Sequence, residues 1–309
     1  MSTLNNLILE YQQSIKGKDT EEKLDLLLYR PAGFIIAKLA HLLHMTPTQL
    51  SIMGVISGVW GASYFLPGHS TGQILWGAVL FILSGIFDSS DGQLARISQQ
   101  STPMGLILDG ICDNIVFASI YLCAAATALP SWGWWIYPLA FLGGFCHSFQ
   151  CAILDFYHRE YLYFGHGKNK TLDYWNPSVE EAKNNFLQAQ TKHEKILNRL
   201  RFTWVAQQRK MSTRTNEERQ YMRHLATHPE ANISDNFAAD YRGFNYPLLK
   251  YWRLLGPNFH TFSIIFFILL GRFDLYLLLI DILALNVVIL VMRMIQRKTD
   301  QELLARWPQ

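Results

Sequence analysis

Four acidic residues lie close together in an otherwise apolar stretch of this 309-residue chain. Asp88 and Asp91 are three residues apart, Asp109 and Asp113 are four apart, and a helix would place each pair on one face. Carboxylates are costly at membrane depth and persist mainly where they bind something. Four converging like charges would repel one another unless a cation lies among them, and an oxygen-rich cluster suits Mg²⁺ or Mn²⁺.

The surrounding sequence predicts membrane helices. The chain is 50% hydrophobic, and its apolar residues concentrate in six stretches near the roughly 20 residues that a helix needs to cross a bilayer. These stretches are 47–66, 73–90, 106–129, 133–154, 256–273 and 275–296. We therefore predict an all-α membrane protein with six transmembrane helices around a polar cavity that faces the cytoplasm. The acidic pairs fall at the end of the second helix and the start of the third, where Pro103 opens the third helix.

The distribution of Lys and Arg predicts how these helices are oriented. The linkers without a basic residue are 67–72, 130–132 and 273–274. Most basic residues occur in the N-terminal segment, the 96–103 turn, the 157–254 segment and the tail after Met292. Cytoplasmic loops are the ones enriched in basic residues. We expect the acidic site, both termini and the 157–254 segment on the cytoplasmic side, in agreement with an even number of crossings.

Composition excludes several classes of protein. The net charge of +3 is too small to indicate nucleic-acid binding. Residues 1–30 lack the long apolar core of a cleavable signal peptide. The chain has no dinucleotide fingerprint and no phosphate-binding Gly/Lys loop. All cysteines lie in predicted membrane helices without Cys-x-x-Cys spacing, which predicts reduced packing residues.

Changes in polarity along the chain predict five segments. They are a polar N-terminal segment (1–30), an interfacial helix followed by transmembrane helices one to four (31–156), a cytoplasmic helical insertion (157–254), transmembrane helices five and six (255–298) and a cytoplasmic tail (299–309). The interfacial helix is expected at 34–44, which is amphipathic and too short to span. Thr46-Pro47 predicts the start of the first crossing, as an N-cap followed by a helix-start proline.

The insertion itself is expected to be a helical hairpin. Residues 178–181 have the form of a capping box, and apolar residues recur at helical spacing from Val179 to Trp204. A second helix is predicted from Asn216 to Thr227. The simplest interpretation of its many basic residues is a solvated surface, and attraction to anionic lipid headgroups is the alternative.

The acidic residues belong to a longer string of fixed spacing, D-x2-D-G-x2-A-R-x8-G-x3-D-x3-D. Its fixed positions are Asp88, Asp91, Gly92, Ala95, Arg96, Gly105, Asp109 and Asp113. This string resembles the signature of the CDP-alcohol phosphotransferase family of membrane enzymes, which act in phospholipid synthesis. The resemblance covers 47–154 and 255–296, and it does not cover the insertion or the first 30 residues.

The resemblance implies transfer of a substituted phosphate from a CDP-linked donor to an alcohol, with release of CMP. It implies that Asp88, Asp91 and Asp109 bind Mg²⁺ or Mn²⁺, as two ions, together with the donor pyrophosphate. Asp113 would belong to the same metal site and act as the general base toward the acceptor hydroxyl. This role has a physical reason, because an alcohol is a poor nucleophile until a positioned base takes its proton.

The same resemblance assigns the other motif positions to the nucleotide. Gly92 and Gly105 would let the nucleotide lie against the helix backbones, since glycine permits close approach to a ligand. Ala95 would be small for the same reason, and Arg96 would orient the motif or the nucleotide phosphates. The family also implies a homodimer. Each glycine could instead serve helix packing, and Arg96 could instead be a basic anchor at the membrane surface.

The third helix favours one type of donor. The family branch that uses CDP-amino alcohols resembles Asp-His-Gly-Cys-Asp at this place, whereas the run from Asp109 to Asp113 has Gly110 in the histidine position. This favours phosphatidyl transfer from CDP-diacylglycerol, with a CDP-amino-alcohol enzyme acting on a lipid hydroxyl as the alternative. The acceptor stays open, although few arginines are placed to bind a phosphorylated one.

Two other classes of protein are alternatives to the enzyme. A transporter could use the acids to relay protons or bind cations, and a membrane scaffold could use the basic insertion to recruit a partner. Four further polar residues near the cytoplasmic helix ends could line an acceptor pocket or form interhelical hydrogen bonds. They are His147, Gln150, Asn258 and His260.

Overall fold

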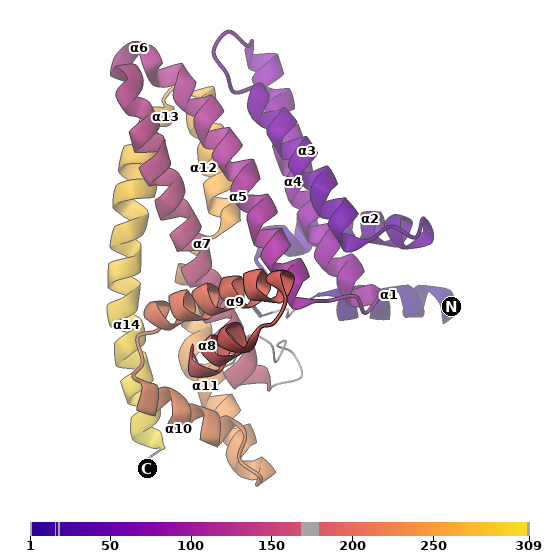
Figure 1. Ribbon diagram of the computed structural model, residues 1–309, viewed down its shortest axis with the longest axis vertical. Coiled ribbons are helices and arrows are strands. Elements are labelled where there is room, and N and C mark those ends of the chain that lie inside the picture. Colours follow the sequence, from indigo (N-terminus) through magenta and orange to yellow (C-terminus); the bar gives the residue numbers. More distant parts are fainter. Residues whose placement is uncertain (1, 16, 18, 168–178, 308–309) are drawn as a thin grey trace. The chain divides into compact units, whose positions relative to one another are not determined.

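The computed structural model describes residues 2–15, 17, 19–167 and 179–307 (Figure 1). The regular elements of these residues are all helices, without a strand among them, which confirms the all-α prediction. The chain divides into two compact units. Unit 1 contains Met1–Ser148 and Pro257–Ala284, and unit 2 contains Phe149–Gly256 and Leu285–Gln309.

Three packed helices form the centre of unit 1. They are α3 (Pro47–Ser63), α4 (Thr71–Ile97) and α5 (Pro103–Ala125). Glycines allow the first two to approach closely, because a Cβ on Gly61 would lie 2.8 Å from the carbonyl oxygen of Gly77. A Cβ on Gly58 would collide with Val116 of α5 in the same way. Small residues at helix contacts are typical of membrane helices.

Local capping signals set where these helices begin. Thr46 forms a capping box with Gln49, and the Thr102 hydroxyl accepts a hydrogen bond from the backbone N–H of Gly105 at 3.0 Å. The predicted helix starts at Pro47 and Pro103 are therefore confirmed. Ser70 and Gln73 form another capping box at the start of α4. Each box satisfies backbone N–H groups that the first turn leaves without a partner.

The N-terminal segment of unit 1 contains two α-helices and a π-helical turn. They are α1 (Ser2–Ser14), η1 (Asp25–Tyr29) and α2 (Arg30–Leu42). Helix α2 buries Phe34 and Ala37 but exposes Ile35, 62% accessible, and Leu42, 71% accessible. It covers most of the amphipathic stretch predicted at 34–44, but it begins earlier, at Arg30, and ends at Leu42. Its place at the membrane surface stays a prediction.

The remaining helices of unit 1 follow a tight turn. After α5 come η2 (Ala126–Ala128), α6 (Leu129–Trp132) and η3 (Gly133–Trp135), with Gly133 at a φ of 56°. Helix α7 (Ile136–His166) then begins in unit 1 and continues into unit 2. The last elements of unit 1 are α12 (Pro257–Leu269), α13 (Phe273–Leu275) and the π-helical η7 (Tyr276–Ala284).

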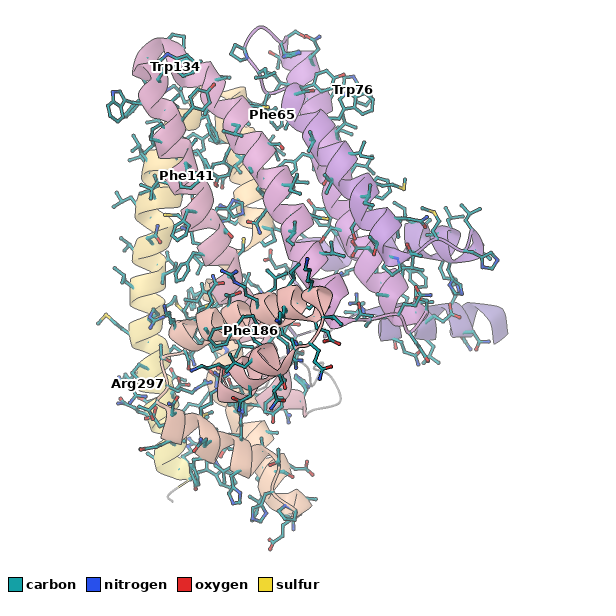
Figure 2. The ribbon with its side chains drawn as sticks, viewed as in Figure 1. Phe65, Trp76, Trp134, Phe141, Phe186 and Arg297 are labelled. Carbon is teal, nitrogen blue, oxygen red and sulfur yellow. The ribbon has the colours of Figure 1, made fainter. Side chains whose placement is uncertain are left out.

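The outer surface of unit 1 is strongly apolar. Figure 2 shows Trp76, Trp134 and Phe141 pointing away from their helices, and their accessible fractions are 65%, 78% and 80%. Exposed apolar surface on this scale is costly in water and suits a lipid environment.

Three helical stretches among the described residues are long and apolar enough to cross a membrane: Thr71–Ile97, Leu108–His166 and Phe273–Arg306. The second has 59 residues and contains the turn at Gly133. Of the six predicted crossings, those at α3 and α12 have helices of only 17 and 13 residues. The six-crossing count therefore stays a prediction, while the membrane character of the chain is supported.

Unit 2 is also helical. With the second part of α7 it contains α8 (Val179–Gln188), α9 (Lys192–Met211), α10 (Asn216–Ala226), α11 (Ala231–Trp252), η6 (Arg253–Leu255) and α14 (Leu285–Arg306). The predicted helix at Asn216 is confirmed as α10. The capping box at Ser178 lies outside the described residues.

The predicted helix through Val179 and Trp204 is wrong in one respect, because it is two helices. Helix α8 ends at Gln188, and α9 begins after Thr191, whose hydroxyl accepts from the backbone N–H of Glu194 at 3.1 Å. The capping box of Thr191 and Glu194 starts a new helix at this point, although the apolar spacing continues from one helix into the next. Helix α11 was not predicted, so the insertion is larger than a single hairpin.

A buried ion cluster lies inside unit 2. The Arg214 guanidinium is 1% exposed, pairs with Glu160 of α7 and contacts Asp300 of α14 at 2.7 Å. It also donates to the Tyr241 hydroxyl of α11 at 3.2 Å. Burial lowers the pKa of Arg214, but the charges of Asp300 and Glu160 outweigh it and raise that pKa. The guanidinium therefore stays charged and ties the insertion to two long helices.

Candidate metal and nucleotide site

Three of the predicted metal-binding carboxylates come together in unit 1. Asp88 and Asp91 lie near the end of α4, and Asp109 lies near the start of α5. Each offers a carboxylate oxygen within 4.8 Å of the others. Asp91 is buried, whereas Asp88 and Asp109 are half-buried. Two consecutive helices thus present an all-oxygen donor set, which fits a hard divalent cation such as Mg²⁺ or Mn²⁺.

Asp113 lies beside this group. It follows Asp109 by one helical turn, about 6 Å along the helix axis. It lines a cavity together with Asp88, Asp91, Ser51 and residues of the α3, α4 and α5 contact, namely Gly54, Val55, Ser84, Cys112 and Val116. The structure therefore brings all four predicted aspartates to one place, with Asp113 one turn from the carboxylates of the close group.

A serine that the sequence analysis missed contacts the group. Ser51, in the second turn of α3, donates a hydrogen bond to Oδ2 of Asp91. A lone serine in an apolar helix gives no signal in the sequence, because such residues are common packing and hydrogen-bonding residues in membrane helices. Its role follows only from the packing of α3 on α4.

The two motif glycines differ from the glycines that pack helices. The three atoms nearest to a Cβ on Gly92 would all belong to the Arg96 guanidinium, the closest at 3.5 Å. Among the described residues, a Cβ on Gly105 would meet only the Thr102 hydroxyl, at 3.2 Å. A Cβ on Gly58 would instead meet Val116 at 2.5 Å. The backbone at Gly92 and Gly105 is therefore not covered by a neighbouring helix. Ala95 is half-buried on the same side of α4 as Gly92.

Arg96 binds the N-terminal segment. Its Nε donates to the Ser14 carbonyl oxygen at 2.5 Å, and its Nη2 is buried without a hydrogen-bond partner among the described residues. Gln93 supports the same contact, since its amide donates to the Ser14 hydroxyl at 3.1 Å and to the Arg30 carbonyl at 3.2 Å. One part of Arg96 thus orients the motif helix, and its buried Nη2 has no hydrogen-bond partner among the described residues.

Arg30 completes this attachment. Its Nη1 donates to the Ser89 hydroxyl at 3.1 Å, and its Nε donates to Glu21 at 2.9 Å. Ser89 lies within the motif, directly after Asp88. The N-terminal segment therefore holds the face of α4 that adjoins the carboxylates, a role that the sequence analysis did not foresee.

The surroundings of the motif are acidic. Burial, with the charges of Asp25, Asp88 and Glu22, raises the pKa of the Tyr29 hydroxyl to about 12. The Asn258 amide donates to Asp25 at 2.8 Å and to Glu22 at 3.1 Å. A concentration of carboxylates of this kind favours a bound cation.

Two histidines that could have lined an acceptor pocket are instead buried in a hydrogen-bond network. The rings of His147 and His260 stack at 3.7 Å, and both residues are at most 3% exposed. The Tyr121 hydroxyl lies 3.1 Å from His147 and donates to Asp281 at 2.8 Å, while the Tyr276 hydroxyl lies 2.6 Å from His260. These contacts favour the interhelical alternative.

A family model matches the part of the chain that carries this site, and curated proteins match about a third of the chain. The family model described as CDP-alcohol phosphatidyltransferase matches residues 44–161. Phosphatidylinositol phosphate synthase of Corynebacterium glutamicum is 36% identical over 95 residues, which cover 30% of this chain and 42% of that protein. The protein of the same name from Mycolicibacterium smegmatis is 34% identical over 94 residues, covering 29% and 41%.

A third relative differs in its name. The bifunctional IPC transferase and DIPP synthase of Aquifex aeolicus is 28% identical over 100 residues, covering 31% of this chain and 22% of that protein. The chain thus spans less than half the length of these curated relatives. The family model, which matches residues 44–161, contains the motif and the helix pair that presents it. Residues 44–161 thus match the CDP-alcohol phosphatidyltransferase family, the family that the motif resembles.

Proposed function

We propose that this protein transfers phosphatidyl from CDP-diacylglycerol to an alcohol, with release of CMP, in phospholipid biosynthesis. The observation that carries this proposal is the meeting of Asp88, Asp91 and Asp109 within 4.8 Å in the family-matched segment. A pyrophosphate is itself negative, so it can lie beside these carboxylates only with a cation between them.

In this proposal Asp88, Asp91 and Asp109, together with Asp113, would hold two Mg²⁺ or Mn²⁺ ions. The chemistry supplied by divalent ions there is neutralisation of the pyrophosphate and of the charge that develops on the leaving CMP. The donor atoms fit, because carboxylate oxygens are the ligands that these ions prefer.

Asp113 accepts the acceptor's proton. The hydroxyl oxygen attacks the phosphatidyl phosphorus, its proton passes to an Asp113 carboxylate oxygen, and the bond from that phosphorus to the CMP oxygen breaks. Gly92, Ala95 and Gly105 leave the helix backbones open to the nucleotide, as the uncovered glycines support. Arg96 donates to a phosphate oxygen of the nucleotide in this proposal, which the absence of a hydrogen-bond partner for its Nη2 among the described residues supports.

The membrane arrangement belongs to the same proposal. Six crossings would place both termini, the carboxylates and the insertion on the cytoplasmic side, where the CDP-linked donor and a soluble alcohol meet. The uneven distribution of Lys and Arg supports this orientation. The five predicted segments and the homodimer also remain proposals, the homodimer by family resemblance alone.

The test is a reaction with purified protein. It is incubated with CDP-diacylglycerol, Mg²⁺ or Mn²⁺, and separately with serine, glycerol phosphate, inositol or inositol phosphate. CMP is measured together with the mass of the lipid formed. The last acceptor is included because two relatives are named phosphatidylinositol phosphate synthases. We expect metal-dependent CMP and one matching lipid.

Failure to release CMP with any of these alcohols would count against phosphatidyl transfer. CMP release from a CDP-amino alcohol and diacylglycerol would instead identify the amino-alcohol branch. Cation flux in proteoliposomes without CMP release would identify a transporter.

A further inference from the structure

Helix α9 of unit 2 presents a basic and apolar face that no other part of the described chain covers. Its exposed basic residues are Lys192, Lys195, Arg199 and Lys210. Between them Ile196 is 61% exposed and Leu200 is 36% exposed. At 100° per residue these six side chains lie within an arc of about 140°. No ion pair joins the four basic side chains to other described residues.

The acidic residue of α9 is used elsewhere. The Glu194 carboxylate accepts hydrogen bonds from the backbone N–H groups of Gln190 and Thr191, both at 3.1 Å. This capping contact holds it at the start of the helix. The exposed face therefore keeps a net positive charge.

Contacts with α14 indicate where the C-terminal end of α9 lies relative to the membrane. Arg293 donates to the carbonyl oxygen of Met211, the last residue of α9, at 3.0 Å. Arg293 is also where α14 changes character, since 282–292 has no charged residue and Arg297 and Lys298 follow shortly after it. Basic residues at the end of an apolar helix mark the boundary between membrane and water. The C-terminus of α9 thus lies at this boundary.

The direction of α9 keeps the rest of the helix near that depth. Within unit 2, Figure 1 shows α9 running across the long axis of α14 rather than along it. A helix that ends at the boundary and runs across a membrane-spanning helix stays in the plane of the membrane surface. Its basic and apolar side chains are the two kinds that hold a helix in this plane.

We propose that α9 is a membrane-surface helix that binds anionic lipid headgroups. Lys192, Lys195, Arg199 and Lys210 contact the headgroup phosphates, and Ile196 and Leu200 enter the boundary between headgroups and acyl chains. Charge and apolar area act together here, which is the combination that peripheral binding requires. The inference does not depend on the proposed enzymatic activity, because the family match ends at residue 161.

The experiment measures backbone hydrogen exchange of the intact protein in lipid nanodiscs. One set of discs contains phosphatidylcholine alone, and the other contains phosphatidylcholine with one-third phosphatidylglycerol. Exchange is followed by mass spectrometry in peptides from 192–211. We expect α9 to exchange about tenfold more slowly in the anionic discs at low salt, and this difference to shrink near 1 M salt, where charges are screened over about 3 Å.

Paired variants separate lipid binding from folding. Lys195→Gln with Arg199→Gln removes two charges from α9, and Lys298→Gln with Arg306→Gln removes two exposed charges from α14 as the matched control. We expect the first pair to abolish most of the difference between the discs and the control pair to retain it. Unchanged exchange in α10 and α11 checks that the insertion stays folded.

Equal exchange of α9 in both kinds of disc would overturn the proposal. This includes equally slow exchange, because α9 would then be protected by protein contacts. An equal loss in both variant pairs would also overturn it, since the effect would then follow net charge and not this face.

Discussion

At the scale of single residues, the main feature of the site is the repulsion between neighbouring carboxylates. Asp88, Asp91 and Asp109 place carboxylate oxygens within 4.8 Å, next to an N-terminal segment with further acidic residues. Such a group is stable only with a cation or with bound protons. Asp113 lies one turn away, where it can serve as a base without belonging to the close group. In the proposed mechanism, this separation gives different roles to chemically identical side chains.

The role of Asp113 can be tested by an isosteric change. Asp113→Asn removes the proton acceptor and keeps the side-chain volume, so we expect CMP release to fall by about 10²–10⁴-fold, the range of general base catalysis. The rate is measured with purified protein at saturating donor and metal. Asp274→Asn is the matched control, because Asp274 pairs with Arg272 and Trp132 and takes no part in the carboxylate group. A full rate in Asp113→Asn would refute the assignment.

Substitution by alanine should affect stability differently at two glycines of unit 1. Gly92→Ala places a methyl group where no helix packs, so we expect normal thermal stability with a higher KM for the CDP-linked donor. Gly58→Ala places it 2.5 Å from Val116, so we expect destabilisation by about 1–3 kcal/mol from overpacking. Thermal unfolding and donor titration measure both. Equal destabilisation by both changes would contradict a nucleotide role for Gly92.

At the scale of elements, the catalytic helix pair is supported from two sides. Helix α3 forms a hydrogen bond to Asp91 through Ser51. The N-terminal segment forms hydrogen bonds with Ser89, Gln93 and Arg96. Residues that orient metal ligands are expected to affect metal affinity without touching the metal. The family match begins at residue 44, so it includes α3 and leaves out the N-terminal segment.

Ser51→Ala tests the first of these supports. Loss of the hydrogen bond to Asp91 should raise the Mn²⁺ concentration for half-maximal CMP release by about 10–100-fold, as for other residues behind metal ligands. The rate at saturating metal should change less. Ser63→Ala is the control, since the Ser63 hydroxyl donates to the Trp60 carbonyl of its own helix and lies away from the carboxylates. An unchanged metal requirement would show that Ser51 does not orient Asp91.

Arg214→Ala tests how the insertion is held together. The change leaves Glu160 and Asp300 buried without their cation, so we expect unit 2 to lose about 3–5 kcal/mol of stability. Protease cleavage within α9–α11 or denaturant unfolding measures the loss. Arg306→Ala removes an exposed partner of Asp240 and should cost less than about 1 kcal/mol. Equal stability of the two variants would contradict the buried cluster.

At the scale of the whole molecule, a metal-dependent enzyme of this kind should be stabilised by its metal. Chelation with EDTA should abolish CMP release reversibly and lower the Tm, because a ligand that binds only the folded state stabilises it by RT ln(1 + [L]/Kd). Added Mn²⁺ should restore both. Asp91→Ala should show little of this Tm shift, whereas Asp274→Asn should keep it. A Tm shift that survives in Asp91→Ala would place the metal elsewhere.

Most of the helix pattern and all motif positions could be predicted from the sequence because they depend on local signals. The N-caps at Thr46 and Thr102 start helices through local hydrogen bonds, which do not depend on the rest of the fold. Carboxylates three or four residues apart lie on one helix face because of helix geometry. The same reasoning failed where two local signals competed, as at Thr191, whose capping box ends a run that the apolar spacing continues.

The sequence by itself determined the chemistry of this protein: apolar helices, acidic residues at fixed spacing and a family motif. Only the tertiary structure decided which residues from distant parts of the chain contact one another. Three contacts join segments that are far apart in the chain. They are the hydrogen bond from Ser51 to Asp91, the hydrogen bond from Arg96 to the Ser14 carbonyl, and the stacking of His147 on His260. Such contacts arise from the packing of whole helices, which depends on the shapes of both surfaces and leaves no periodic trace in either segment.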